Sequence, residues 1–337
     1  MSEIPRGAIR FNTDSNKPEL WDGSQWAEFQ LSTPNLGRSV DTEPGARGLW
    51  GGGSGPNASP ADIDIIDYIT IASTGDAIDF GDLLSTTSNF GACASSTRGI
   101  FFGGLNPTVT DVIQYVTIAS TGDAQDFGDL SAAREYGTSC SNATRGLYGG
   151  GRTPTIQTKI EYVTIASTGN AQDFGDLITT KQALSACASP TRGVFGGGTT
   201  PGGTNIIEFV TISTLGNAQD FGDLPRITGN ECGACSNPVR GLFAGGFSTN
   251  NTIDYITIAT TGNATNFGDL TKLRYGPSGC SSPTRGVFGG GTEPSPVGRT
   301  NVIDYVTIAS TGDAVDFGDL TQDRTLSEAC SNAHGGL

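Results

Sequence analysis

The stretch TRGVFGGGTEPSPVGRTNVIDYVTIASTGDAVDFGDL, from Thr284 to Leu320, recurs with small changes along nearly the whole chain. An arginine opens each copy, and a double glycine follows it four or five residues later. The arginines lie 45 to 51 residues apart, at Arg47, Arg98, Arg145, Arg192, Arg240 and Arg285. A repeat of this length is typical of propellers and solenoids, in which each repeat is one supersecondary unit.

The copy from 130 to 177 divides into four short segments with the composition of β-strands. They are SAAREYGTSCSNAT (131–144), RGLYGGG (145–151), IEYVTIAS (160–167) and AQDFGDL (171–177). The turn Thr168–Ala171 carries Gly and Asn, the residues that tolerate the positive φ of a tight hairpin. Four antiparallel strands of this kind form one propeller blade, so the sequence predicts an all-β propeller.

Counting the strand types predicts seven blades. From Arg47 onward the second, third and fourth types occur six times each. The first type is counted seven times in the chain, the last being TLSEACSNA (325–333). The N-terminus supplies a further set of three strands, at 6–11, 19–21 and 26–29, with a turn at 22–24. The C-terminal strand is therefore expected to complete the N-terminal blade and to remove the open edges of the array. The expected single domain, 1–337, has blade 1 at 6–30 plus 325–333 and blades 2 to 7 at about 37–83, 86–130, 132–177, 180–224, 227–270 and 272–320.

The order of landmarks in each unit resembles the kelch repeat. In one unit they are Arg134, Gly149-Gly150, Tyr162 and Phe174. Parallel sets are Arg274, Gly289-Gly290, Tyr305 and Phe317, and Arg226, Gly245-Gly246, Tyr255 and Phe267. The chain departs from the kelch pattern in using Phe where Trp is usual, and in its nearly identical ASTG turns. The resemblance implies a kelch-like propeller over essentially the whole chain.

Two further segments resemble structural proteins of tailed bacteriophages. GAIRFNTDSNKPELWDGSQWAEFQ (7–30) looks like a short β-segment that recurs in tail-fibre proteins. YVTIASTGNAQDFGDL (162–177) is similar to repeats in virion-associated proteins of marine phages, including cyanophages. The resemblance implies a virion component, such as a tail, fibre or capsid-decoration protein, without indicating which.

Charge and composition exclude some partners. The formal net charge of −15 argues against binding to nucleic acid or to anionic membrane surfaces. No segment has the length of a membrane span, and the start MSEIPRGAIRF lacks the features of a signal peptide, so synthesis in the host cytoplasm without membrane insertion is expected.

Six of the seven cysteines occupy one position of the repeat. They are Cys93, Cys140, Cys187, Cys235, Cys280 and Cys330, and Cys232 lies outside this pattern. Equivalent positions of a radial array lie around an axis instead of in pairs, so we expect buried free thiols in preference to disulfides or a metal site.

The residues for catalysis are few, and the prediction is no enzyme, no cofactor and no metal. His334 is the single histidine, and no nucleophile elbow or phosphate-binding loop is present. Asp or Asn recurs in each turn between the third and fourth strands, which favours a role in the turn over calcium binding. For the repeated arginines we expect Arg–Asp pairing in preference to anion binding.

The loops between the second and third strands differ from blade to blade in length and chemistry. Unlike loops on a rigid scaffold are common binding elements, although simple drift explains them equally well. The candidate binding residues are Asn106, Pro107, Thr108, Arg152, Thr153, Thr155, Thr200, Asn250, Glu293 and Arg299.

The sequence as a whole favours a non-enzymatic structural or adhesion module of a phage virion. Its expected partners are other virion proteins or a glycan or protein of the host surface, and an oligomer within the particle stays open. The alternatives are a glycan-active propeller enzyme and a cytosolic kelch-type adaptor that binds a protein.

Overall fold

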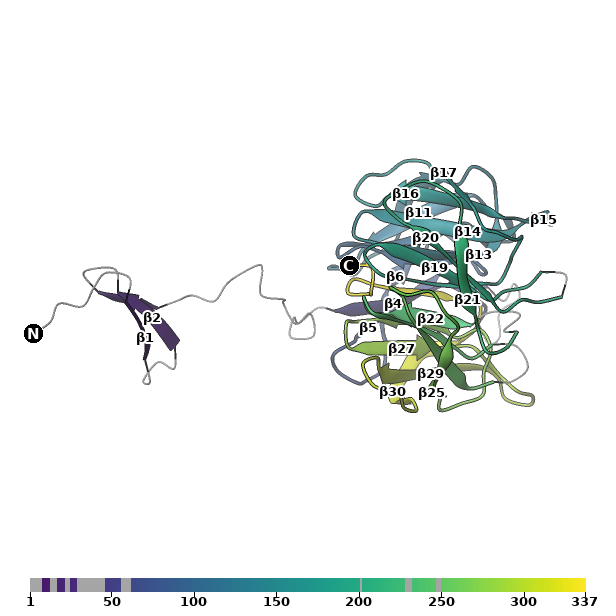
Figure 1. Ribbon diagram of the computed structural model, residues 1–337. Coiled ribbons are helices and arrows are strands. Elements are labelled where there is room, and N and C mark those ends of the chain that lie inside the picture. The colour runs from purple at the N-terminus through teal and green to yellow at the C-terminus, as the bar shows by residue number, and fades with distance from the viewer. Residues whose placement is uncertain are drawn as a thin grey trace, which may run out of the picture. The chain divides into compact units, whose positions relative to one another are not determined.

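The computed structural model describes residues 8–12, 17–21, 25–28, 46–55, 62–200, 202–227, 232–246 and 250–337. The chain divides into two compact units, Met1–Ser39 and Val40–Leu337. In the described residues no helix is long and apolar enough to cross a membrane. The architecture is all-β (Figure 1).

The first unit is a three-stranded antiparallel sheet. Strands β1 (Ile9–Asn12), β2 (Lys17–Trp21) and β3 (Trp26–Glu28) lie in the order β1-β2-β3. The Trp21 and Trp26 rings, paired across β2 and β3, lie 5.5 Å apart, and the Arg10 guanidinium lies 4.3 Å from the Trp26 ring. The sequence therefore indicated these strands correctly, while the expected turn at 22–24 lies outside the described residues.

The second unit is a propeller (Figure 1), and the pairing of its strands gives six blades. Each blade is an antiparallel sheet whose inner strand contains one of the six repeated cysteines. From the inner to the outer strand, the first three blades are β31 (Glu328–Ser331), β4 (Arg47–Gly51), β5 (Ile65–Thr70), β6 (Ile78–Asp82); β7 (Gly91–Ala94), β8 (Arg98–Phe102), β11 (Val112–Thr117), β12 (Gln125–Asp129); and β13 (Glu135–Ser141), β14 (Arg145–Thr153), β16 (Lys159–Thr164), β17 (Gln172–Asp176). The other three are β18 (Ser185–Ala188), β19 (Arg192–Gly196), β20 (Ile206–Thr211), β21 (Gln219–Asp223); β22 (Gly233–Ser236), β23 (Arg240–Ala244), β24 (Thr252–Thr257), β25 (Thr265–Asp269); and β26 (Ser278–Ser281), β27 (Arg285–Gly289), β29 (Gly298–Thr307), β30 (Val315–Arg324).

The prediction of seven blades is wrong. The C-terminal strand β31 pairs with β4, with Glu328 opposite Gly51 and Ser331 opposite Gly48, and not with the N-terminal strands. It thus fills the inner position that the sequence count had assigned to the start of the predicted blade 37–83, of which residues 37–45 lie outside the described part. The inner strands contact one another in the cyclic order β31, β7, β13, β18, β22, β26 and back to β31, so six blades close the ring.

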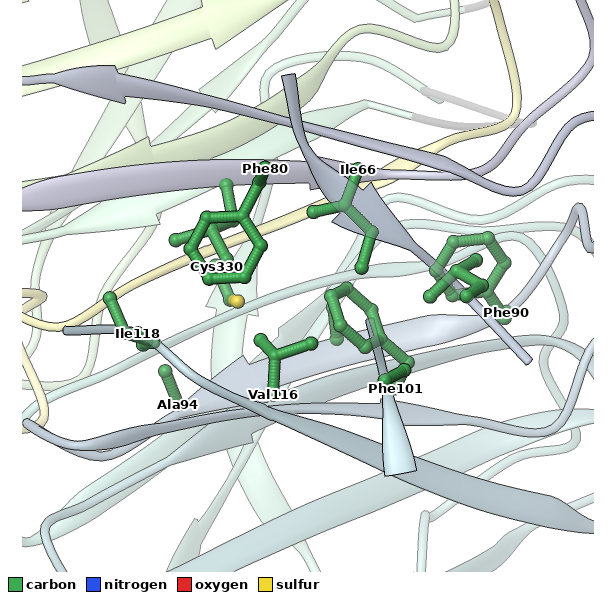
Figure 2. Close-up of a cluster of buried hydrophobic side chains, with 12 residues drawn as sticks. Ile66, Phe80, Phe90, Ala94, Phe101, Val116, Ile118 and Cys330 are labelled. Carbon is green, nitrogen blue, oxygen red and sulfur yellow. The ribbon is translucent and has the colours of Figure 1, made fainter. Parts of the chain in front are cut away.

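The hydrophobic core lies between neighbouring blades. Each of six clusters of buried side chains combines residues of two adjacent blades. Figure 2 shows one of them, in which Ile66 and Phe80 of one blade pack with Phe101 and Val116 of the next. The six repeated cysteines belong to these clusters, and each of their thiols packs on the glycine that follows the repeated arginine of the neighbouring blade. A Cβ atom added to Gly146, for example, would lie 2.8 Å from Cys93 Sγ, so this position leaves no room for a side chain.

A hydrogen bond of the repeated turn joins each blade to the one before it. Oδ1 of the Asp or Asn in the turn accepts the backbone N–H of the last aspartate in the preceding outer strand. Asp82 N donates to Asp123 Oδ1 at 3.1 Å, and Asp129 N donates to Asn170 Oδ1 at 3.2 Å. These residues therefore have a structural role, but as acceptors between blades; the positive φ expected of the turn is found at its glycine, such as Gly169, and not at Asn170. Because only a carbonyl-type oxygen is needed, Asn serves as well as Asp.

An ion pair links the first and third strands in five of the six blades near the start of the inner strand, and it is buried in four of them and partly exposed at Arg226. The cation precedes that strand, and the carboxylate belongs to the third strand of the same blade. The pairs are Arg324–Asp67, Arg134–Glu161, Lys181–Glu208, Arg226–Asp254 and Arg274–Asp304. In the remaining blade Thr87 and Gln114 take the two positions, so that cation and carboxylate are absent together.

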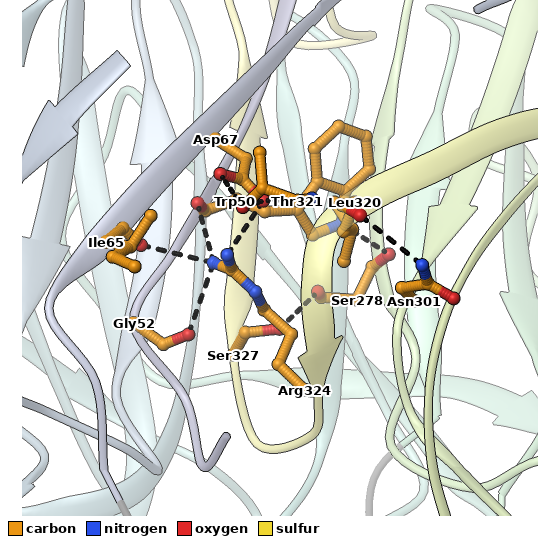
Figure 3. Close-up of polar contacts among 10 residues, drawn as sticks. All are labelled: Trp50, Gly52, Ile65, Asp67, Ser278, Asn301, Leu320, Thr321, Arg324 and Ser327. Carbon is orange, nitrogen blue, oxygen red and sulfur yellow. Dashed lines mark hydrogen bonds and ion pairs between the residues drawn. The ribbon is translucent and has the colours of Figure 1, made fainter. Parts of the chain in front are cut away.

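Figure 3 shows the pair in the blade that the C-terminus completes. Arg324 Nη2 lies 2.7 Å from Asp67 Oδ2, and Arg324 Nη1 donates to the carbonyl oxygen of Ile65 at 3.1 Å. Asp67 also accepts the backbone N–H and the hydroxyl of Thr321, which lies in the outer strand β30 of the preceding blade. The carboxylate therefore links two blades as well as neutralising the arginine.

Ring closure is testable by two truncations. Deletion of residues 1–39 should leave the thermal unfolding of the propeller unchanged, because β31 rather than the N-terminal unit completes its sheet. Deletion of residues 326–337 should abolish cooperative unfolding and cause aggregation, because it exposes β4 as an edge. Calorimetry of the two variants measures both effects. If deletion of residues 1–39 abolished cooperative unfolding and deletion of residues 326–337 left it unchanged, closure through the N-terminal strands would be supported instead.

The ion pair gives a second prediction. Arg324→Met should lower the free energy of unfolding by about 3–5 kcal/mol, because it leaves the Asp67 carboxylate buried without its partner. The blade without an ion pair indicates a matched control, because it carries Thr87 at the cation position and Gln114 at the carboxylate position. The double variant Arg324→Thr with Asp67→Gln should recover most of the loss in denaturant titrations. Equal destabilisation of both variants would contradict the pairing.

Candidate functional site

The structure places the expected binding residues in the connections between the second and third strands. Asn106 ends β9 (Leu105–Asn106), and Thr108 begins β10 (Thr108–Val109), with Pro107 between them. Arg152 and Thr153 end β14, and Thr155 begins β15 (Thr155–Ile156). Glu293 ends β28 (Thr292–Glu293), and Arg299 lies near the start of β29. Thr200 and Asn250 lie in the corresponding connections before β20 and β24. We call the side of the propeller that carries these connections the loop face.

Most of these side chains are held by neighbouring residues. Arg152 Nε donates to Glu135 Oε1 at 2.8 Å, and its guanidinium lies 4.9 Å from the Tyr136 ring. Arg299 donates to the carbonyl oxygen of Gly55 in the next blade. Asn250 Oδ1 accepts the backbone N–H of Thr252 at 2.8 Å. These described side chains are therefore fixed before any partner binds and lose little conformational entropy on contact.

An axial channel runs between the six inner strands, and three adjoining cavities mark its course. The cavity nearest the loop face, of about 40 Å³, is lined by Asn89, Tyr136, Ala183, Cys232, Leu326 and Glu328 among others. The next, of about 50 Å³, includes Thr138, Ser139, Ser278 and Glu328. The third, also about 50 Å³, extends past the six cysteines to His334. Space of this size holds a few water molecules and not a substrate, since pockets for metabolites measure about 300–1,000 Å³.

A ring of left-handed residues forms the channel mouth on the loop face. Four non-glycine residues have φ between 50° and 58°, each four positions before a repeated cysteine: Asn89, Tyr136, Ala183 and Leu326. Gly276 occupies the same position with φ 66°. Backbone hydrogen bonds join members of the ring across blades: Asn89 N donates to Leu326 O, Tyr136 N to Asn89 O, and Ala183 N to Tyr136 O. The sequence analysis missed this ring, because the residues at its positions share no type that would indicate a left-handed backbone.

The C-terminal segment closes the opposite end of the channel. His334 Nε2 lies 2.7 Å from the carbonyl oxygen of Ala94, and Nδ1 accepts the N–H of Gly336 at 3.0 Å. These bonds place the imidazole proton on Nε2. A Cβ atom on Gly336 would overlap the carbonyl group of Ser141, so the segment after His334 fits only because it is glycine. Burial lowers the pKa of His334, which keeps the ring neutral.

The seven cysteines are free thiols, as the sequence predicted. Six are buried, and burial raises the pKa of Cys93 and of Cys187 to about 12. A thiol with so high a pKa carries almost no thiolate at neutral pH, so these residues are packing groups and not nucleophiles. Cys232 is half-buried and lines the channel mouth.

The repeated arginines are structural, but their partners differ from those expected. Each reaches the carbonyl oxygen of an isoleucine in another blade instead of an aspartate; Arg145 Nη1, for example, lies 2.9 Å from Ile212 O. The same guanidinium stacks on the aromatic residue of its own third strand, 4.9 Å from the Tyr162 ring. Among the described residues, no three His, Cys, Asp or Glu side chains are grouped as around a metal ion.

Comparison with known proteins adds no assignment. No family model matches the chain, and no curated protein matches it. The repeated residues with identified contacts join blades to one another, whereas the loop face and the channel mouth carry the residues that differ between blades.

Protonation of His334 provides a prediction with a defined sign. Because its folded pKa lies below the ordinary value of 6.5, the unfolded chain takes up a proton first as the pH falls. The contribution of the neutral ring to stability is complete above about pH 6.5 and is lost as the pH falls from there toward the folded pKa. The free energy of unfolding of the wild-type chain should therefore fall more steeply between about pH 6.5 and 5 than that of His334→Gln. Parallel curves for the two proteins would show that the imidazole is not buried in its neutral form.

Proposed function

We propose that the chain is a non-enzymatic binding module that contacts its partner through the loop face. The observation that carries this proposal is the contrast between the two parts of the repeat. Residues that join the blades are nearly identical from one to the next, whereas the loops between the second and third strands differ in length and chemistry. A rigid scaffold with unlike loops at one face is a common arrangement for recognition.

Two features of the structure support binding over catalysis. The side chains of Arg152 and Asn250 are held by neighbouring residues, so these two groups are positioned before contact. The cavities of the channel, at about 40 and 50 Å³, are smaller than the sites that usually hold a substrate.

We further propose that the module belongs to a phage particle. The resemblance of residues 7–30 and of the YVTIASTGNAQDFGDL repeats to virion proteins supports this assignment. The partner is then a neighbouring virion protein or a glycan or protein of the host surface. Hydroxyl and amide groups dominate the loops, which suits either kind of partner.

The loop face is testable with a variant that keeps the contacts of Arg152 and Arg299. Replacement of Asn106–Thr108 and Glu293–Val297 by Gly-Ser segments should abolish partner binding and leave the melting temperature nearly unchanged. Arg152 and Arg299 are retained, because Arg152 neutralises the buried Glu135 and Arg299 contacts the next blade. Binding is measured on a panel of bacterial surface polysaccharides and purified virion proteins.

The matched control alters the opposite face. Thr121→Ala, Thr168→Ala and Thr311→Ala change exposed residues of the repeated turns and should leave binding intact. Loss of binding in this control, with the loop variant unaffected, would assign recognition to the turns. Mass spectrometry of purified particles tests the virion assignment separately, and absence of the chain from them would contradict it.

A further inference from the structure

Two neighbouring blades break the repeat at the first residue of their outer strands. That residue is Ile78 in β6 and Val315 in β30, and the two residues are 60% and 56% exposed. The other four blades carry a polar residue there: Gln125, Gln172, Gln219 and Thr265. The turn before β6 is hydrogen-bonded to β30, since Gly75 N donates to Phe317 O at 2.8 Å. The two exceptions to the repeat therefore belong to one part of the surface.

The polar residue has a structural role that the aliphatic residue cannot take. Tyr115 Oη donates to Gln125 Oε1 at 2.7 Å, and the same bond forms in the next blade. The equivalent tyrosines, Tyr68 and Tyr305, lie opposite the two aliphatic residues in register, where their hydroxyls find no acceptor in the side chain. The exchange gives up a hydrogen bond and exposes apolar surface to water, so the stability of the blades does not explain it.

Carboxylates surround the two aliphatic residues. Each of the two blades supplies three, all exposed: Asp76, Asp79, Asp82, Asp313, Asp316 and Asp319. Three of the other blades carry Asn at the turn position: Asn170, Asn217 and Asn263. Partial burial and the neighbouring carboxylates of Asp76 and Asp316 raise the pKa of Asp319, as a concentration of negative charge does. Arg47 and Arg285 offset part of this charge, but each stacks on the tyrosine of its own third strand and donates to a carbonyl oxygen of the next blade.

The two aliphatic side chains fit within a single protein interface. Measured through the hydrogen bond between Gly75 and Phe317, the Cα atoms of Ile78 and Val315 lie at most about 25 Å apart. One partner's share of a standard interface, about 800 Å², has a diameter of about 32 Å. Apolar groups with tyrosine and arginine beside them, framed by charged residues, have the composition of a contact surface with an apolar centre and a polar rim.

We propose that the outer strands β6 and β30 bind a basic segment of another protein. Two apolar side chains of that segment pack on Ile78 and Val315, and its lysine or arginine side chains face the carboxylates. An extended segment of about eight residues spans the two contacts. A second copy of the chain fits less well, because it also carries −15 and would bring the same carboxylates together. This surface lies on the outer strands and not on the loop face, so the two binding sites are tested independently.

Fluorescence anisotropy of a labelled peptide of about ten residues, in which leucine and lysine alternate, tests the surface on the full-length chain. The variant Ile78→Gln with Val315→Gln installs the residue of three other blades and should weaken binding by about tenfold or more, because two apolar contacts are lost. Leu215→Thr with Val239→Thr is the matched control, since it removes two residues that are each 57% exposed in other blades. It should leave binding unchanged. A peptide with serine in place of leucine should bind wild type more weakly and bind the glutamine variant equally well.

A second pair of variants tests the charge. Asp76→Asn with Asp313→Asn keeps the Oδ1 atoms that accept backbone N–H groups of the preceding blades. It should weaken binding of the leucine–lysine peptide by about threefold at low salt and reduce the dependence on salt. Asp173→Asn with Asp220→Asn removes the same charge from two blades without the aliphatic residues and should have a smaller effect.

Three results would overturn the proposal. They are equal affinity of wild type and the glutamine variant for the leucine–lysine peptide, equal loss of affinity in the two aspartate variants, and equal loss in the control that alters Leu215 and Val239. Sedimentation equilibrium tests the other occupant. A wild-type dimer that Ile78→Gln with Val315→Gln abolishes would assign the surface to a second copy of the chain instead.

Discussion

The antiparallel pairing of β31 with β4 is the contact on which the whole propeller depends. It joins residues that are more than 270 positions apart in the sequence, and the entropy cost of closing so long a loop grows only slowly with its length. In return, closure creates a sixth hydrophobic interface, in which Trp50 and Ile69 pack against Val287 and Phe317. Every blade then has two neighbours, and no inner strand is left without one.

The most repeated residues of the sequence are explained by contacts between blades. The glycine after each arginine admits the neighbouring thiol, the arginine itself binds a distant carbonyl group, and the turn Asp or Asn caps the preceding blade. Each contact tolerates the substitutions that its chemistry allows. Asn170 replaces Asp123 because both accept a backbone N–H, whereas a side chain at Gly146 would collide with Cys93. Repetition in this chain therefore reports assembly of the ring.

The sequence was sufficient for the strands, the turns and the propeller architecture, because these follow from local pattern and period. It was insufficient for the number of blades. The strands at 9–12, 17–21 and 26–28 exist, but which sheet the C-terminal strand joins is decided by pairing across the whole chain, which no local pattern encodes. The buried ion pairs did leave a signal in the sequence. In the blade of Arg134 and Glu161, the cation lies six residues before the cysteine and the carboxylate directly precedes the third-strand tyrosine. In the blade without an ion pair, Thr87 and Gln114 occupy these two positions.

The channel mouth could not be read from the sequence, because its backbone conformation is imposed by the ring. A non-glycine residue in the left-handed region costs about 1–3 kcal/mol and persists only where its surroundings determine it. Here the backbone hydrogen bonds from Asn89 to Leu326, from Tyr136 to Asn89 and from Ala183 to Tyr136 hold these residues in the left-handed conformation. Since main-chain atoms alone make these bonds, the side chains are free to differ. The ring therefore fixes the backbone of these residues but not the type of their side chains. As a result an amide, an aromatic ring and an aliphatic group, those of Asn89, Tyr136 and Leu326, surround the channel mouth.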